Sequence, residues 1–108
     1  MIVIIETRVF TRRIKEVMSD DQYMELQEAL VNRPDVGPVI QGTGGLRKLR
    51  WNIKNKGKSG GVRAIYYWMA NDEQIYMLYA YLKSEQENLT SEQKKALKRI
   101  VERWSDEK

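Results

Sequence analysis

Apolar and polar residues alternate along several short stretches of the chain, the spacing expected of β-strands with one buried face. The stretch over residues 46–53 predicts a strand with an apolar face and a basic, polar face. Its apolar face holds Leu49, Trp51 and Ile53, and its polar face holds Lys48, Arg50 and Asn52. Residues 2–10, rich in β-branched side chains, predict an N-terminal strand, and residues 62–69 and 74–82 predict two more.

Helical spacing of apolar residues fills much of the remaining chain. Thr11 is expected to cap a short helix whose buried face holds Ile14, Val17 and Met18. Ser19 is followed three residues later by Gln22, which is the spacing of a capping box. This pair predicts a second helix, with Tyr23, Leu26 and Leu30 on one face and an end at Pro34.

The last helix is predicted to begin near Thr90 and Gln93, which have the same capping spacing. Its buried stripe holds Leu97, Ile100, Val101 and Trp104, which we interpret as core, with a groove for a partner protein as the alternative.

The order of these elements predicts one α+β domain over residues 1–108. We expect a small twisted antiparallel sheet made of the N-terminal strand and a three-stranded meander. Asn71 and Asp72 provide turn residues between the last two strands. An N-terminal helical hairpin covers one face, and a C-terminal helix completes the fold. Residues 35–45 and 54–61 are predicted loops.

Positive charge is concentrated in the middle of the chain. The formal net charge is +4, yet residues 36–71 contain no acidic residue and seven basic ones. The remainder of the chain therefore has 12 basic and 15 acidic residues and is acidic overall. A basic segment in an otherwise acidic protein favours a polyanionic partner, because clustered positive charge attracts phosphates.

The residue types that are missing limit the chemistry. The chain has no cysteine, which excludes disulfides and thiolate metal sites, and no histidine, the usual near-neutral base and commonest metal ligand. We therefore expect neither a metal nor a cofactor. Residues 1–5 are apolar but lack the basic lead-in and cleavage site of a signal peptide, and no stretch is long enough to span a membrane. A cytoplasmic protein without a membrane partner is expected.

One end of the predicted sheet gathers residues suited to RNA cleavage. Strand alternation places Lys48 and Arg50 on one face, and the ends of the neighbouring strands would bring four cations and one phenol together. These candidate catalytic residues are Lys48, Arg50, Arg63, Tyr81 and Lys83. Arginines suit a crowded phosphorane, a lysine among other cations has a lowered pKa and suits a general base, and a tyrosine can orient an unpaired base.

Three local patterns resemble the RelE/HigB family of type II toxins, within the RelE/ParE superfamily. Residues 45–51 are a basic strand after a glycine-rich loop, and residues 60–67 resemble a Gly-x-Arg-aliphatic-x-Tyr strand. Residues 79–84, followed by residues 88–90, resemble the last strand of that family and its basic exit.

This resemblance implies a toxin that enters the ribosomal A site and cleaves mRNA there, inhibiting translation. It implies a cognate antitoxin as partner, together with the ribosome, its 16S rRNA and mRNA, and we expect the toxin alone to be a monomer. By position, Lys48, Arg50, Arg63 and Lys83 match basic positions of the family's active site. Family members differ in the residue that acts as base, and Lys48 is our assignment. We assign RNA or ribosome contacts to Arg47, Lys54, Lys56 and Lys58.

Three other interpretations remain open from the sequence. Lys48 and Arg50 are also compatible with the ordinary solvated face of a sheet, and the three loop lysines with a solvated charge run. A ParE-like toxin that targets gyrase without cutting RNA would share the fold. A non-catalytic RNA-binding module would bind RNA in a salt-sensitive way without cleaving it, whereas no helix-turn-helix spacing supports DNA binding.

Overall fold

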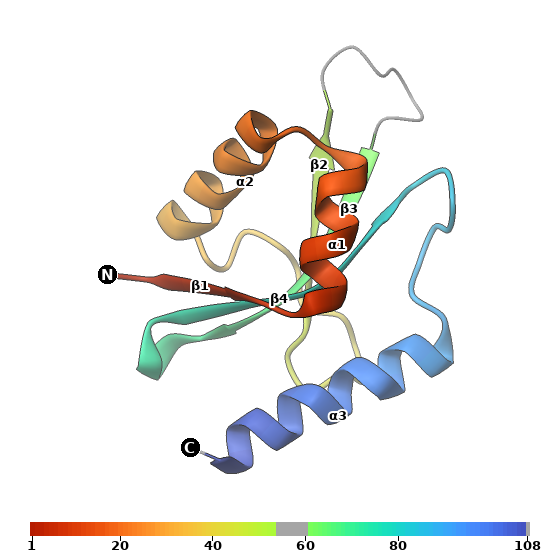
Figure 1. The fold of residues 1–108 in the computed structure, drawn as a ribbon. Helices are drawn as coiled ribbons and strands as arrows, with labels where there is room; N and C mark the ends of the chain where they lie inside the picture. The colour runs from red at the N-terminus through yellow and green to blue at the C-terminus, as the bar shows by residue number, and fades with distance from the viewer. Residues whose placement is uncertain (54–60, 108) are drawn as a thin grey trace.

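The computed structural model describes residues 1–53 and 61–107, and its elements follow the predicted order (Figure 1). In chain order they are β1 (Val3–Glu6), α1 (Arg8–Val17), α2 (Asp20–Asn32), β2 (Arg47–Asn52), β3 (Gly61–Met69), a short 3-10 turn η2 (Ala70–Asp72), β4 (Gln74–Leu82) and α3 (Ser91–Glu107). The α+β class is therefore confirmed. The loop predicted over residues 54–61 lies, except for Gly61, outside the described residues.

The four strands form one open sheet in the order β1-β4-β3-β2. β2, β3 and β4 pair antiparallel as the predicted meander, whereas β1 pairs parallel with β4. The sheet is therefore mixed, and the expectation of an antiparallel N-terminal strand was wrong in this detail. Alternation within a strand determines which side chains share a face, but it carries no information about the direction of a distant neighbour.

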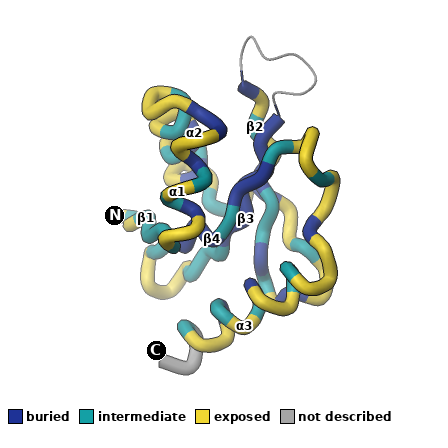
Figure 2. The backbone as a smooth tube through the Cα atoms, turned by 45° about the vertical axis from the view of Figure 1, so that its right-hand side comes forward, coloured by how far each residue is buried: buried dark blue, intermediate teal, exposed yellow. Residues whose placement is uncertain are grey.

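Helices cover both faces of the sheet. One core cluster joins α1 and α2 to the sheet and includes Phe10, Ile14, Leu26, Leu30 and Tyr66. A second cluster joins α3 to the opposite face and includes Ile65, Leu78, Leu97 and Val101. Figure 2 shows the result, with β3 and β4 buried at the centre and the outer surfaces of the helices exposed.

A bulge in β4 determines which face its last residues occupy. Ile65 pairs with Tyr79 and Tyr66 pairs with Met77, so Leu78 is an extra residue between the two pairs. Leu78 and Tyr79 both pack in the α3-side cluster. From Tyr79 onward the alternation of β4 is therefore shifted by one residue, as expected after a bulge.

The first helix begins earlier than the sequence pattern predicted. Thr7, and not Thr11, is the N-cap of α1, and its hydroxyl oxygen accepts a hydrogen bond from the backbone N–H of Phe10. The same hydroxyl donates to the carbonyl of Leu78 at 2.8 Å. The β-branched residues at 7–10 favoured a strand locally, but Phe10 and Ile14 belong to one buried helical face, so tertiary packing overrides that propensity.

The capping pairs predicted for the other two helices are confirmed. Ser19 and Gln22 exchange side-chain and backbone hydrogen bonds as a capping box at the start of α2. Thr90 and Gln93 make the same reciprocal bonds before α3. Among the described residues, no helix is long and apolar enough to cross a membrane.

Thr7→Ala is expected to destabilise the fold, because it removes both the α1 cap and the bond to β4. Loss of an N-cap hydroxyl costs about 1 kcal/mol, which lowers the unfolding temperature by about 4–8 °C in a domain of this size. Thermal unfolding followed by circular dichroism measures the change. Thr7→Ser keeps the hydroxyl and should unfold close to the wild type; an unchanged Thr7→Ala would show that the cap contributes nothing.

Candidate functional site

The five candidate residues lie together on the sheet face that α3 partly covers. Arg50 pairs with Arg63, and Arg63 pairs with Tyr81, so these three side chains form a row across three strands. Lys48 lies in the next row of the same face, two residues before Arg50. The backbone N–H of Lys83 donates to the Gly61 carbonyl at 2.9 Å, which extends the pairing one residue beyond β4. The predicted convergence of the strand ends is therefore present.

The β4 bulge is the feature that brings Tyr81 to this row. Without the extra residue at Leu78, the alternation from Tyr76 would place Tyr81 on the α1 and α2 face. The sequence argument paired Tyr81 with Lys83 by spacing alone, which does not reveal the bulge.

Arg63 is a buried cation without an acidic partner. Its side chain is 8% exposed, and within the described part of the chain no carboxylate lies within ion-pair distance. Among the described residues its side chain makes one hydrogen bond, a long one of 3.4 Å to the carbonyl of the preceding residue. A Cβ on Gly61 would lie 3.2 Å from its Nη1, so glycine leaves room for the guanidinium. Most donors of Arg63 therefore have no hydrogen-bond partner within the described part of the chain.

The surroundings of Lys48 lower the pKa of its side-chain amine. Its Nζ donates to Oδ1 of Asn88 at 2.9 Å. Partial burial lowers the pKa of Lys48, and the positive charges of Arg50, Arg63 and Lys94 lower it further. A lowered pKa increases the neutral fraction of the amine, which a general base requires.

The segment between β4 and α3 contributes residues that the sequence argument missed. Asn88 holds the Lys48 amine, and Lys94 in the first turn of α3 adds to its positive surroundings. Glu87 acts in the opposite direction, and its negative charge raises the pKa of Lys48. These residues follow Lys48 by about 40 positions, and only the packing of α3 against the sheet brings them close.

Tyr81 is a buried phenol on the face of the cationic row. The residue is 1% exposed, and its oxygen has no hydrogen-bond partner among the described residues. Burial raises its pKa, and the nearby charges of Arg63 and Arg50 oppose that shift. A buried hydroxyl without a partner is costly and marks a position where a ligand or water completes the bonding.

Arg47 is not part of this cluster. Its pairing with Tyr66 places it on the opposite face from Lys48, where its Nη1 donates to the carbonyls of Asp35 and Gly37. Arg47 therefore holds the loop before β2. Lys54, Lys56 and Lys58 lie outside the described residues.

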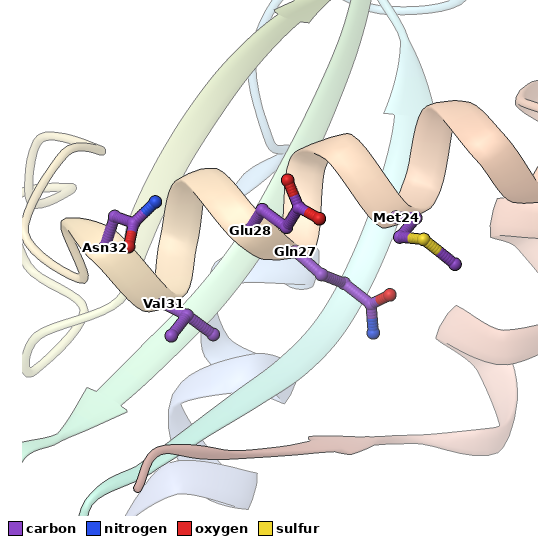
Figure 3. A pocket seen from close by; sticks show the side chains of 5 residues that line it. All are labelled: Met24, Gln27, Glu28, Val31 and Asn32. Carbon is purple, nitrogen blue, oxygen red and sulfur yellow. The ribbon is translucent and has the colours of Figure 1, made fainter.

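The α2 side of the sheet carries a separate surface depression. An open depression on α2 is lined by Met24, Gln27, Glu28, Val31 and Asn32 (Figure 3). The helix carries acidic residues and no basic one. No group of three or more metal-ligating His, Cys, Asp or Glu side chains occurs within residues 1–53 and 61–104.

Fold and site together define a small α+β domain with a cationic sheet face, a class suited to binding a phosphate backbone. Over residues 2–108 the chain matches the family described as the RelE toxin of the RelE/RelB toxin–antitoxin system. The chain belongs to this RelE toxin family, which confirms the resemblance seen in the sequence.

Solved structures support the same fold. The chain is similar to the intact E. coli RelBE toxin–antitoxin complex, with a TM-score of 0.57, 10% identity, and coverage of 74% of this chain and 94% of that chain. It is also similar to a double Arg-to-Ala mutant of the E. coli toxin RelE in the free state, with a TM-score of 0.58, 12% identity, and coverage of 80% and 87%. At such identities the likeness concerns the fold alone.

Proposed function

We propose that this RelE-family toxin is an endoribonuclease that cleaves mRNA in the ribosomal A site and thereby inhibits translation. The observation that supports this most directly is the row of Arg50, Arg63 and Tyr81 beside Lys48, with which no described carboxylate forms an ion pair. Such a row can hold a phosphate and stabilise the additional charge that develops on it.

The proposed reaction uses the RNA's own 2′-hydroxyl as nucleophile and needs no metal. Lys48 takes the 2′-proton, and the 2′-oxygen attacks the adjacent phosphorus. Arg50 and Arg63 stabilise the phosphorane through charged hydrogen bonds. The P–O bond to the 5′-oxygen then breaks, leaving a 2′,3′-cyclic phosphate and a 5′-hydroxyl end.

The leaving oxygen must receive a proton, and the two candidate donors are Tyr81 within the row and Lys83 at its edge. Tyr81 retains its proton because burial raises its pKa, and its hydroxyl has no described partner that would compete with the RNA. Lys83 is exposed at the end of β4 and supplies a further positive charge. We assign Tyr81 to orienting or protonating the leaving group and Lys83 to binding the backbone.

The small size of the site explains why the ribosome is expected to be required. A few side chains on an open sheet cannot fix a flexible RNA in the in-line geometry that the reaction needs. The ribosome would hold the mRNA, and cations outside the cluster, including the proposed RNA contacts, would hold the toxin. Free RNA should therefore be a poor substrate. A cytoplasmic location follows from this target.

A cognate antitoxin is the second proposed partner, consistent with the family and with the RelBE complex that the fold resembles. Coexpression of the antitoxin should relieve growth arrest.

Primer extension on a reporter mRNA tests the proposal. Induced expression in a bacterial host should produce cuts within the reading frame during translation, and the cuts should disappear when translation is blocked. Growth arrest without cuts would contradict the nuclease and favour the gyrase-targeting activity of ParE-like toxins. RNA binding without growth arrest would support the interpretation of the protein as a non-catalytic RNA-binding module.

A further inference from the structure

A small cleft lies between β4 and the first turns of α3, and the proposed cleavage chemistry does not use it. This β4–α3 cleft has a volume of about 160 Å³ and is lined by Tyr79, Gln93, Ala96 and Leu97. Tyr79 shares a sheet face with the cationic row, and its ring centroid lies 5.9 Å from that of Tyr81. The cleft therefore adjoins the proposed phosphate site.

The polar edge of the cleft presents hydrogen-bond donors. Oε1 of Gln93 already accepts from the backbone N–H of Thr90 at 2.9 Å and from Nε2 of Gln86 at 2.8 Å. These bonds orient the amide, and its Nε2 lies 3.5 Å from the Tyr79 hydroxyl. The Tyr79 hydroxyl oxygen accepts this bond from Gln93, so its O–H can donate a hydrogen bond to a ligand. A ligand that fills the cleft thus meets donors along one edge and apolar walls elsewhere.

The size of the cleft matches one aromatic ring. An apolar cavity of about 150 Å³ accepts a single benzene molecule, so the β4–α3 cleft has room for a six-membered ring. Unpaired bases stack on aromatic side chains such as tyrosine. The cleft is open to solvent on one side, so a pyrimidine ring would lie within this volume and a purine would extend beyond it.

The position of the cleft matches the geometry of a nucleotide. Tyr79 pairs with Ile65, and Arg63 lies two residues before Ile65 on β3, so Tyr79 and Arg63 are diagonal neighbours. Such neighbours have Cα atoms about 7–8 Å apart. One nucleotide spans a similar separation between its phosphate and the far edge of its base. A phosphate at the arginines would therefore place an adjacent base within reach of Tyr79.

We infer that the β4–α3 cleft binds one unpaired pyrimidine next to the phosphate held by Arg50 and Arg63. Its donor edge favours uracil, whose carbonyl oxygens are acceptors, over cytosine, which has an amino group in place of one carbonyl. This inference rests on the proposed function and specifies the base beside the cut.

Ala96→Leu tests the cleft by filling it. Ala96 is exposed on α3, and leucine is a good helix former, so the helix should be retained. The assay compares translated mRNAs that differ only in one base beside the cut. Wild-type protein should cut the uracil-containing site fastest. Ala96→Leu should cut it about 5- to 100-fold more slowly and lose the preference, since stacking on tyrosine contributes this much.

Two further variants separate the role of the Tyr79 hydroxyl from that of its ring and control for the Ala-to-Leu change itself. Tyr79→Phe keeps the ring but removes the hydroxyl, so it should retain a preference for pyrimidines and lose that for uracil over cytosine. Ala70→Leu makes the same change at an exposed turn far from the cleft and should behave as the wild type. An Ala96→Leu protein with an unchanged base preference would overturn the inference, as would weaker antitoxin binding as the only effect of this variant.

Binding measurements keep this test independent of cleavage. Fluorescence anisotropy with a short 2′-deoxy oligonucleotide, carrying either uracil or an abasic position, does not require the reaction. If the wild type binds the uracil probe more tightly and Ala96→Leu does not, the inferred base-binding role of the cleft is supported. If no mRNA is cut in the same protein, the proposed nuclease function alone fails. Equal binding of both probes by the wild type would overturn the inference that the cleft binds a base.

Discussion

Arg63→Met is expected to abolish growth arrest and, at the same time, to raise the thermal stability of the protein. The guanidinium is one of two arginines proposed to stabilise the phosphorane, and removal of one such donor typically lowers the rate about 10²- to 10³-fold. Arg63 is also buried without a described acidic partner. Its charge therefore costs folding free energy, which methionine would not.

The expected gain in stability is about 1 kcal/mol, equivalent to about 4 °C or more in unfolding temperature for a domain of this size. Differential scanning calorimetry measures the stability, and primer extension during translation measures the cleavage. Arg12→Met removes the same charge from an exposed position on α1, on the other side of the sheet, and serves as the matched control. A destabilised Arg63→Met protein would show that Arg63 serves the fold and would remove it from the proposed site.

Lys48→Arg is expected to abolish cleavage although it keeps the positive charge. Arginine does not release its proton in the accessible pH range, so it cannot replace a lysine that acts as general base. General-base catalysis contributes about 10²- to 10⁴-fold, which sets the size of the expected loss. Near-normal cleavage by Lys48→Arg would show that the residue acts through its charge and not as a base.

The pH dependence of the cleavage rate gives a second, independent test of Lys48 as the general base. Its pKa is lowered, but the protonated amine remains inactive below that pKa. The rate should therefore rise about tenfold per pH unit and level off once the pH exceeds the lowered pKa. Glu87 raises the pKa of Lys48, so Glu87→Gln should shift the profile to lower pH and increase the rate near neutrality. Single-turnover cleavage on mRNA-programmed ribosomes measures both profiles; a pH-independent rate would contradict the base assignment.

Strand alternation and local capping determined much of the fold from the sequence. The basic face of β2 follows from alternation, because neighbouring side chains of a strand point to opposite faces. Ser19 and Gln22 predicted the start of α2, because a capping box needs only residues three positions apart. The concentration of basic residues at 36–71 likewise required no structure, since it follows from the order of residues along the chain.

Long-range packing decided the features that the sequence left open. The start of α1 at Arg8 reflects the packing of Phe10 and Ile14 on the sheet, and its cap Thr7 also bonds to Leu78, 71 positions away. The direction of β1 depends on its pairing with β4. Neither interaction leaves a local pattern, because each is formed between segments that meet only in the folded chain.

In the candidate site, too, some features follow from the sequence and others only from long-range packing. The sequence predicted Lys48, Arg50, Arg63, Tyr81 and Lys83 as a group from strand alternation and strand ends, and the resemblance to the RelE toxins matched the four cations. The tertiary structure decided how Tyr81 reaches the row, through the β4 bulge, and which residues of the α3 side surround Lys48. Residue types and their spacing are written in the sequence, whereas burial, pairing register and the electrostatic environment exist only after the helices have packed against the sheet.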